Sequence, residues 1–276
     1  MNNKVFILYS AEDAERNGFL IDKYVSACAS QGFEARLLLT DGGGAETRIA
    51  EAGGAAFVIN RTRDAGLASV IRAMGVPVSN PPELTRVAND KLLTHRLLGG
   101  VVAMMPTVRA LDFAAGLAPC CGFPFVIKPV DGHGGSGVEL VAGGEEFQKY
   151  RAAHDISRCI IQPLAEGVGR DMRVYVIAGR PVAAMQRISE GDFRSNYCLG
   201  GKAEIVPLGA LKKDELDIVE AVCAALPIDY AGVDIMRDGG RAVLNEIEDP
   251  VGARMLYTYT DLDPAALHAE HIIGRL

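Results

Sequence analysis

The chain has 276 residues, of which 49% are hydrophobic and 23% charged, with a formal net charge of −7. This composition can bury a sizeable core, but its charge disfavours binding to nucleic acid and to anionic membranes, and no stretch approaches the roughly 20 apolar residues of a membrane span. We therefore expect a cytoplasmic protein without nucleic-acid or membrane partners. The six cysteines lack Cys-x-x-Cys spacing and are expected to stay reduced.

Strands and helices alternate through the first eighty residues. Short apolar runs predict strands over 5–9, 34–39, 56–60 and 76–79. Helices are predicted between them, an amphipathic one over 11–30 and shorter ones near residue 47 and over 67–74. Such alternation is typical of a parallel α/β sheet. Pro81 and Pro82 end the last strand, because proline cannot donate to a ladder, and we place a domain boundary there.

Beyond this boundary the strands become more frequent. A helix is predicted over 84–98 and another at the apolar face of Leu216, Val219, Cys223 and Leu226. Strands are predicted over 123–129, 159–162, 171–178, 181–188, 232–237 and 242–248.

A glycine-rich loop follows the strand that ends near Lys128. Four of the six residues from 132 to 137 are glycines, so the backbone N–H groups can approach a polyphosphate, with Lys128 as a nearby point charge. The loop matches neither a Walker nor a Rossmann motif. A glycine-rich hairpin loop without a ligand explains it equally well, and we interpret His133 as a polar loop residue.

Polar residues alternate along the strand predicted over 171–178. Asp171 and Arg173 share one face, which we expect to look into a cleft. Arg187 lies on the next strand, and Arg194 and Lys202 follow it. A charged turn would explain the last two, but beside an acidic metal site these cations would also bind carboxylates and a transferring phosphoryl group.

Three carboxylates gather on the predicted hairpin of residues 231–248. Glu246 and Glu248 share a strand face, and a three-residue loop at 238–240 would place Asp234 opposite Leu244, diagonal to Glu246. Like charges this close disfavour joint ionisation, which a hard divalent cation such as magnesium relieves. We predict a metal site here, with a solvated acidic strand edge as the alternative.

Together these motifs resemble the ATP-grasp superfamily and, within it, the RimK-like α-L-glutamate ligases. The motifs are Asp-Lys at 90–91, the lysine and glycine loop of 126–137, Asp-x-Arg at 171–173, Glu-Gly-Asp-Phe-Arg-Ser-Asn at 190–196, Gly-Val-Asp at 232–234, and Glu-x-Glu at 246–248 in place of the usual Glu-x-Asn. The resemblance spans about residues 80–250. It implies an α/β protein with α+β ATP-grasp lobes. An N-terminal parallel α/β pre-ATP-grasp domain (1–82) would precede a two-lobed ATP-grasp domain (83–276), whose lobes are a small nucleotide lobe (about 106–165) and a catalytic lobe (about 166–276).

The resemblance also implies roles for individual residues. Those expected to contact ATP are Lys91, Lys128, Gly134, Gly135, Ser136, Gly137, Gln162, Pro163, Leu164, Glu166, Asp171 and Arg173. Two magnesium ions, or manganese in their place, would be held by Asp234, Glu246 and Glu248. The catalytic residues would be Arg187, Arg194 and Asn196.

The implied activity is an ATP-dependent carboxylate–amine ligase that adds an amino acid such as glutamate through an acyl phosphate. Its partners would be a small-molecule amino acid and a carboxylate or peptide substrate, in a homodimer or higher homo-oligomer. Two alternatives remain. One is a ligase for a different peptide or cofactor precursor. The other is a non-catalytic nucleotide-binding regulator, supported by Glu248-Asp249-Pro250 where the family usually has asparagine and a Pro-Gly stretch.

Overall fold

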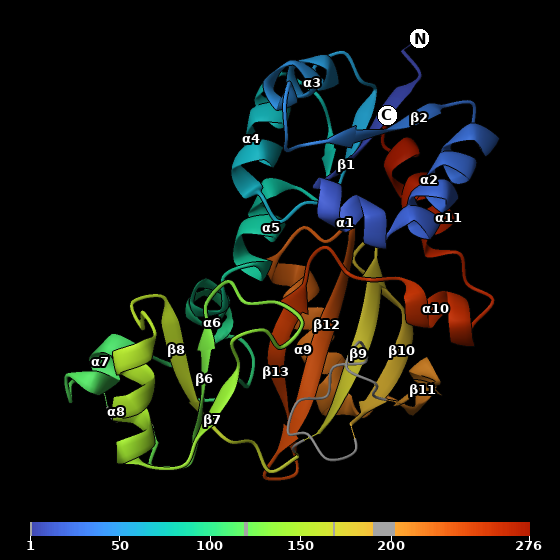
Figure 1. Cartoon of the computed structure of the whole chain (residues 1–276). Coiled ribbons are helices and arrows are strands. Elements are labelled where there is room, and N and C mark those ends of the chain that lie inside the picture. The colour runs from blue at the N-terminus through green and yellow to red at the C-terminus, as the bar shows by residue number, and fades with distance from the viewer. Residues whose placement is uncertain (1, 119–120, 168, 190–201) are drawn as a thin grey trace.

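Three separate sheets organise the chain (Figure 1), which is described here from a computed structural model over residues 2–118, 121–167, 169–189 and 202–276. The combination of one parallel and two antiparallel sheets with helices confirms the expected α/β organisation. Among the described helices, none has both the length and the apolar character needed to cross a bilayer. Cys28 and Cys159 are buried free thiols.

The N-terminal sheet is parallel, as predicted, with the strand order β2-β1-β3-β4. Its strands are β1 (Lys4–Tyr9), β2 (Glu34–Leu39), β3 (Phe57–Asn60) and β4 (Val78–Ser79). Its helices are α1 (Ala11–Arg16), α2 (Gly18–Ser30), α3 (Ala45–Ala52) and α4 (Ala65–Ala73). The prediction of a single helix over 11–30 is wrong, since the segment forms two helices. Asn17 interrupts it, and its side-chain amide donates to the Asp13 carbonyl instead of supporting a continuous helix.

Strand β1 is apolar on both faces because helices cover both. Val5 and Ile7 pack with α2 and with α11 (Pro264–Ile273), whereas Phe6 and Leu8 pack with α3 and α4. Helix α11 comes from the far end of the chain and lies beside α2 (Figure 1). The C-terminal end of the chain therefore completes the core around the N-terminal sheet.

The helix expected over 84–98 is two helices, α5 (Pro82–Ala88) and α6 (Lys91–Leu98). The helical backbone is interrupted before α6, where Asp90 is extended. The Asp90 carboxylate accepts a hydrogen bond from the Leu93 N–H at 2.9 Å. This is an ordinary N-cap. As a result Lys91 begins α6, and its backbone N–H donates to Val130 at the start of the glycine-rich loop.

The small sheet is antiparallel, with the order β5-β8-β6-β7. It contains β5 (Val108–Arg109), β6 (Phe125–Pro129), β7 (Glu139–Val141) and β8 (Cys159–Pro163), with α7 (Ala110–Ala114) and α8 (Gly144–Ala153) against it. Phe125 and Ile127 face this helical core. Strand alternation therefore turns Val126 and Lys128 to the opposite face.

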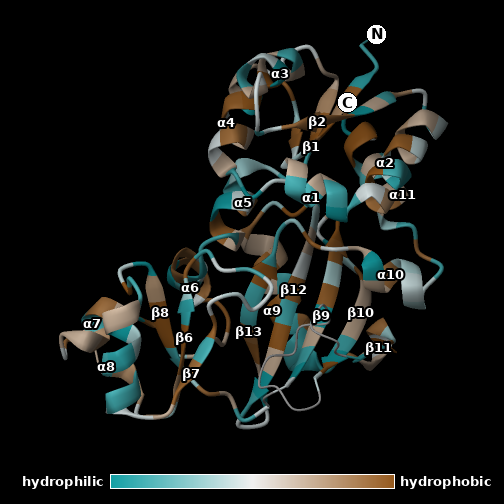
Figure 2. Ribbon diagram, in the orientation of Figure 1, coloured by the Kyte–Doolittle hydropathy of each residue, from teal (hydrophilic) through white to brown (hydrophobic). Residues whose placement is uncertain are grey.

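The large sheet is antiparallel, in the order β11-β10-β9-β12-β13. Its strands are β9 (Arg170–Ile177), β10 (Arg180–Ile188), β11 (Lys202–Val206), β12 (Tyr230–Asp238) and β13 (Arg241–Glu248). A short turn, η2 (Leu208–Ala210), leads into α9 (Lys213–Ala225), which covers one face, and α10 (Arg254–Tyr259) follows β13. Hydrophilic residues interrupt the hydrophobic ones along β9, β12 and β13 (Figure 2). Met172 and Val174 of β9 pack in the core with α9, so strand alternation turns Asp171 and Arg173 to the opposite face, which we call the polar face.

The register of the β12–β13 hairpin corrects our expectation. The loop has two residues, not three, because Asp238 pairs with Arg241, and a bulge lies at Asn245. The bulge reverses the alternation, so that Leu244 stays in the core while Glu246 turns to the polar face directly opposite Asp234. Without the extra residue, Leu244 and Glu246 would share one face.

Candidate active site

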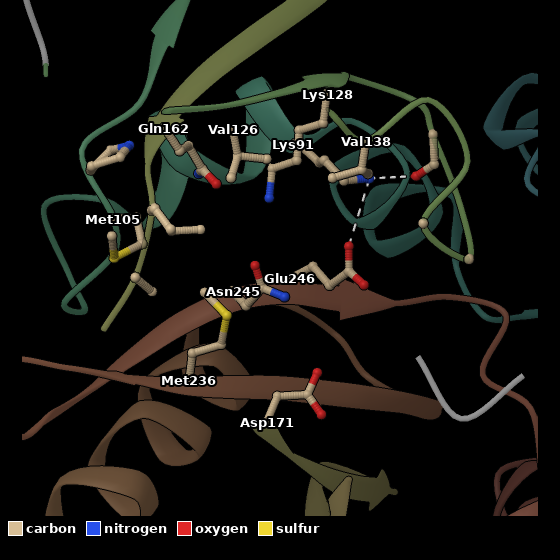
Figure 3. A pocket seen from close by; sticks show the side chains of 16 residues that line it. Lys91, Met105, Val126, Lys128, Val138, Gln162, Asp171, Met236, Asn245 and Glu246 are labelled. Atoms are coloured by element: carbon tan, nitrogen blue, oxygen red, sulfur yellow. Dashed lines mark hydrogen bonds and ion pairs between the residues drawn. The ribbon is translucent and has the colours of Figure 1, made fainter. Parts of the chain in front are cut away.

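A cavity lies between the face of the small sheet that is turned away from α7 and α8 and the polar face of the large sheet (Figure 3). Val126, Lys128 and Gln162 enter it from the small sheet, and Met236 and Glu246 from the large sheet. The other lining residues are Lys91, Met105, Gly132, Gly134, Gly135, Val138, Pro163, Leu164, Ala165, Asp171 and Asn245. We call this space the nucleotide cavity, because it contains most of the residues expected to contact ATP.

Two lysines give one end of the nucleotide cavity a positive charge. Lys128 is only 8% exposed, and burial lowers its pKa to about 8, a shift that Glu246 opposes and Lys91 reinforces. The Lys91 ammonium donates to the Gly132 carbonyl at 2.5 Å and lies 3.6 Å from the Glu246 carboxylate. Two ammonium groups and a nearby carboxylate form a suitable setting for a phosphate chain with its counter-ion.

The glycine-rich loop connects β6 to β7 and borders the same end of the cavity. Gly134 and Gly135 line it, whereas Ser136 and Gly137 lie in the loop outside the lining. Gly137 has φ of +68°, and a Cβ there would lie 2.8 Å from Pro129 Cγ. The turn therefore requires glycine at this position.

The segment after β8 forms the apolar end of the nucleotide cavity. Pro163 and Leu164 line it as expected, whereas Glu166 does not, its backbone N–H instead donating to the Asp238 carboxylate. The Gln162 amide donates to Thr107 at 2.7 Å, which fixes its position.

Two methionines that the sequence reasoning missed, Met105 and Met236, face this end of the cavity (Figure 3). Their apolar surface suits a flat heteroaromatic ring. In the sequence they have no feature that distinguishes them from core methionines.

The three predicted metal ligands meet on the polar face of the large sheet. Asp234, Glu246 and Glu248 each place one carboxylate oxygen within 4.8 Å of the others. Arg173 donates to both oxygens of Asp234 at 2.7 Å and to Glu248 at 2.8 Å. We call these three carboxylates the acidic cluster. Arg173 thus contacts this cluster and does not line the nucleotide cavity.

Arg187 extends this network across β10, β9 and β12. Its guanidinium donates to Asp171 at 2.6 and 2.5 Å and to Asp234 at 2.6 Å. Asp171 is 3% exposed and Asp234 is fully buried. The expected catalytic residues Arg194 and Asn196 lie outside the described residues.

The carboxylates of the acidic cluster differ in their electrostatics. Burial disfavours the charge on Asp234, but the charges of Arg173 and Arg187 outweigh burial and hold its pKa below the usual value. Burial raises the pKa of Glu248, and the neighbouring Glu246 adds to this against the effect of Arg173. A hard divalent cation would stabilise the ionised form of all three groups, so the donor set fits magnesium or manganese.

A second and larger cavity, of about 920 Å³, adjoins the acidic cluster. Arg173, Arg187 and Glu248 line it from the large sheet, and Gly134 borders both cavities. Its remaining walls come from the N-terminal lobe, by which we mean the N-terminal sheet with its helices and connecting segments, from His133 in the glycine-rich loop, and from the chain around α10. We call it the substrate cavity, since a second molecule in it would contact Glu248 of the acidic cluster.

Comparisons with known proteins agree with this arrangement. A family model described as the RimK-like ATP-grasp domain matches residues 88–272. A probable alpha-L-glutamate ligase from Parasynechococcus marenigrum is 30% identical over 212 residues, which make up 74% of this chain and 45% of that protein. The chain thus spans less than half the length of this relative. A probable alpha-L-glutamate ligase from Methanococcoides burtonii is 31% identical over 223 residues, 74% of this chain and 71% of that protein.

The fold has counterparts among solved structures. An ATP-grasp RimK domain protein from Sphaerobacter thermophilus superposes with a TM-score of 0.70, covering 98% of this chain and 100% of that chain at 18% identity. Together with the family match, this likeness confirms the resemblance that the motifs indicated.

Proposed function

The chain belongs to the RimK-like ATP-grasp domain family, and from that premise we propose that it is an ATP-dependent carboxylate–amine ligase. One observation carries the proposal: two lysines and three carboxylates converge where the nucleotide cavity meets the substrate cavity. A phosphate chain bound by Lys91 and Lys128 would end beside the acidic cluster. That is where a substrate in the larger cavity would meet it.

The residues of the site serve four tasks. Lys91, Lys128 and the glycine-rich loop bind the phosphates of ATP. Gln162 and the apolar end of the nucleotide cavity hold its adenine ring. Asp234, Glu246 and Glu248 would hold the magnesium ions, which neutralise phosphate charge when bound. Arg187 and Arg194 stabilise negative charge that develops on the transferring group and the acyl oxygen.

The reaction proceeds in two transfers. A substrate carboxylate oxygen attacks the γ-phosphorus of ATP, and the bond between that phosphorus and the bridging oxygen breaks, releasing ADP. An amine nitrogen then attacks the acyl carbon of the acyl phosphate. The C–O bond to phosphate breaks, and the nitrogen loses a proton to give the amide. The protein supplies position and charge stabilisation, with no covalent nucleophile of its own.

We further propose that the amine is an amino acid such as glutamate. Both relatives described above are probable alpha-L-glutamate ligases, which supports this substrate class. A different peptide or cofactor precursor would use the same chemistry. The activity assay therefore covers both kinds of acceptor.

The test is ADP release with magnesium and ATP against mixtures of amino acids, short peptides and acidic cofactor precursors, with products read by mass. We expect a product equal to two components less one water. Glu246→Gln should lose this activity while keeping its fold, and Glu220→Gln, at an exposed position on α9, should retain it. Ligation undiminished in Glu246→Gln would refute the metal assignment.

A nucleotide-binding regulator is the second candidate. It is favoured by the contacts of Arg173, whose guanidinium pairs with both Asp234 and Glu248 and offsets part of their negative charge. In that case ATP would bind tightly while no mixture of carboxylate and amine released ADP. The same assay, combined with ATP titration calorimetry, separates the two candidates.

A further inference from the structure

The substrate cavity has an excess of positive charge that the reaction itself does not require. Its charged lining residues are Arg16, Arg61, Arg63, Arg173, Arg187, Arg254, Asp13 and Glu248. Arg173 and Arg187 are engaged with the carboxylates of the large sheet, and Arg16 and Arg63 with Asp13. Of the charged groups in this lining, Arg61 and Arg254 have no carboxylate within ion-pairing distance in the described parts of the chain.

Arg61 is a buried cation that has no carboxylate within ion-pairing distance among the described residues, and the carboxyl group on which its charge acts is that of the buried Asp249. It follows β3, is 2% exposed, and is held by Tyr9, by the Val251 carbonyl and by the Tyr230 ring 5.5 Å away. Its Nη1 atom is buried and has no hydrogen-bond partner among the described residues. A buried guanidinium with an unpartnered N–H group is costly, and an anion in the adjoining cavity would reduce that cost.

Arg254 lines the same cavity. It is exposed, begins α10, and follows the 249–253 segment in which the sequence departs from the usual family pattern. Arg61 donates to Val251 within that segment, so the two arginines are linked through a few residues of backbone. Helices α1 and α10 lie at the junction of the N-terminal lobe and the large sheet (Figure 1).

We infer that Arg61 and Arg254 are specificity-determining residues that bind an anionic group of a substrate, remote from the atoms that react. The inference rests on the proposed ligase function. Guanidinium groups bind carboxylate or phosphate through paired, charge-assisted hydrogen bonds, which an uncharged analogue cannot match. The N-terminal lobe therefore takes part in choosing the substrate, through the residue that follows β3.

The test compares matched substrates that differ in one charged group. The pairs are L-glutamate against L-glutamine and O-phospho-L-serine against L-serine, each supplied as amine with ATP, magnesium and a panel of carboxylates. The proteins are wild type, Arg254→Gln, Arg61→Lys and the control Arg151→Gln, at an exposed position on α8. KM and kcat are measured from ADP release.

For one of the two pairs we expect wild type to favour the charged member by at least about tenfold in kcat/KM. Arg254→Gln should reduce this preference to about twofold or less, through KM and with kcat and the KM for ATP nearly unchanged. Arg61→Lys should weaken it less, since the charge remains without the planar fork. Arg151→Gln should behave as wild type. The pair that responds identifies carboxylate or phosphate as the recognised group.

Two outcomes would overturn the inference: a wild type that does not favour either charged member, or a preference that survives in Arg254→Gln. If no mixture is ligated, calorimetry with the same four compounds, magnesium and a non-hydrolysable ATP analogue decides the matter. Selective binding of a charged member that Arg254→Gln removes would uphold the inference while the ligase proposal failed. No selective binding would refute the inference itself.

Discussion

At the scale of single residues, the candidate active site contains a group of charged side chains that are buried from solvent. Asp171, Arg173, Arg187 and Asp234 are each less than a tenth exposed, and they form one connected network. In such surroundings a charge is stable only with its partner, so replacement of one member affects the others.

Lys128 should make nucleotide binding depend on pH. Burial lowers its pKa to about 8, so the ammonium is lost as the pH rises through that value. We expect the Kd for ATP, measured by calorimetry, to rise about tenfold between pH 7 and pH 9. Lys128→Gln should bind more weakly with a flatter profile, and exposed Lys149→Gln should retain the wild-type profile. An equally steep profile in Lys128→Gln would assign the effect to another group.

Arg173 should be essential for stability as well as for the site. Arg173→Met leaves Asp234 and Glu248 without their shared partner, and removing one member of a buried ion pair costs about 3–5 kcal/mol. Urea unfolding should show a free energy of unfolding that is lower by that amount and a lower midpoint. Arg36→Met, at an exposed pair with Glu34, should leave the midpoint unchanged. Equal midpoints for the two variants would mean that the network does not stabilise the fold.

At the scale of elements, local interruptions position the site. The cap at Asp90 begins α6 at Lys91, and the bulge at Asn245 turns Glu246 toward Asp234. Periodicity predicted the elements on either side of both interruptions. It did not predict the interruptions, because an internal N-cap and a bulge each depend on contacts that a regular pattern does not encode.

The glycine-rich loop offers a prediction at this scale. Gly137→Ala places a Cβ 2.8 Å from Pro129 Cγ in a backbone with φ of +68°. We expect the displaced loop to raise the KM for ATP by about fivefold while kcat changes little, since a strained turn costs on the order of 1 kcal/mol. Gly122→Ala, where a Cβ would contact nothing within 4 Å, is the control. An unchanged KM in Gly137→Ala would remove the loop from ATP binding.

Helix α11 should make stability depend on pH. His268 is buried between Tyr24 and Ser79, and burial, reinforced by the charge of Arg61, lowers its pKa well below 6.5. The unfolded chain takes up a proton near pH 6.5 that the folded chain does not. Stability is therefore full above that pH and is lost as the pH falls toward the folded pKa, by about 1.4 kcal/mol per unit.

Urea unfolding at pH 7.5, 6.5 and 5.5 checks this expectation. His268→Gln should lose less stability than wild type over that range, although it is less stable at pH 7.5. His154→Gln, at an exposed position, should follow the wild-type slope. Parallel slopes in all three proteins would mean that His268 does not carry the pH dependence.

At the scale of the whole molecule, the sequence predicted many of the individual strands but not how the sheets and helices pack together. The predicted strands of all three sheets are present, and Asp234, Glu246 and Glu248 do meet. The docking of α11 on the N-terminal sheet and the substrate cavity were not predicted, because both join segments far apart in the chain. The contacts of Tyr24 with His268 and of Arg61 with Val251 span 244 and 190 residues. Hydrophobic periodicity reports which face of an element is buried, not what covers it.

The most direct test of the ligase proposal traces the oxygen atoms of the carboxylate substrate into the products. If a carboxylate oxygen attacks the γ-phosphorus, a carboxylate substrate labelled with ¹⁸O transfers one labelled oxygen to phosphate for each amide formed. Mass spectrometry of the released phosphate should therefore show one ¹⁸O per product molecule. Unlabelled phosphate, with both labelled oxygens still in the carboxylate, would mean hydrolysis of ATP by water and would contradict the proposed mechanism.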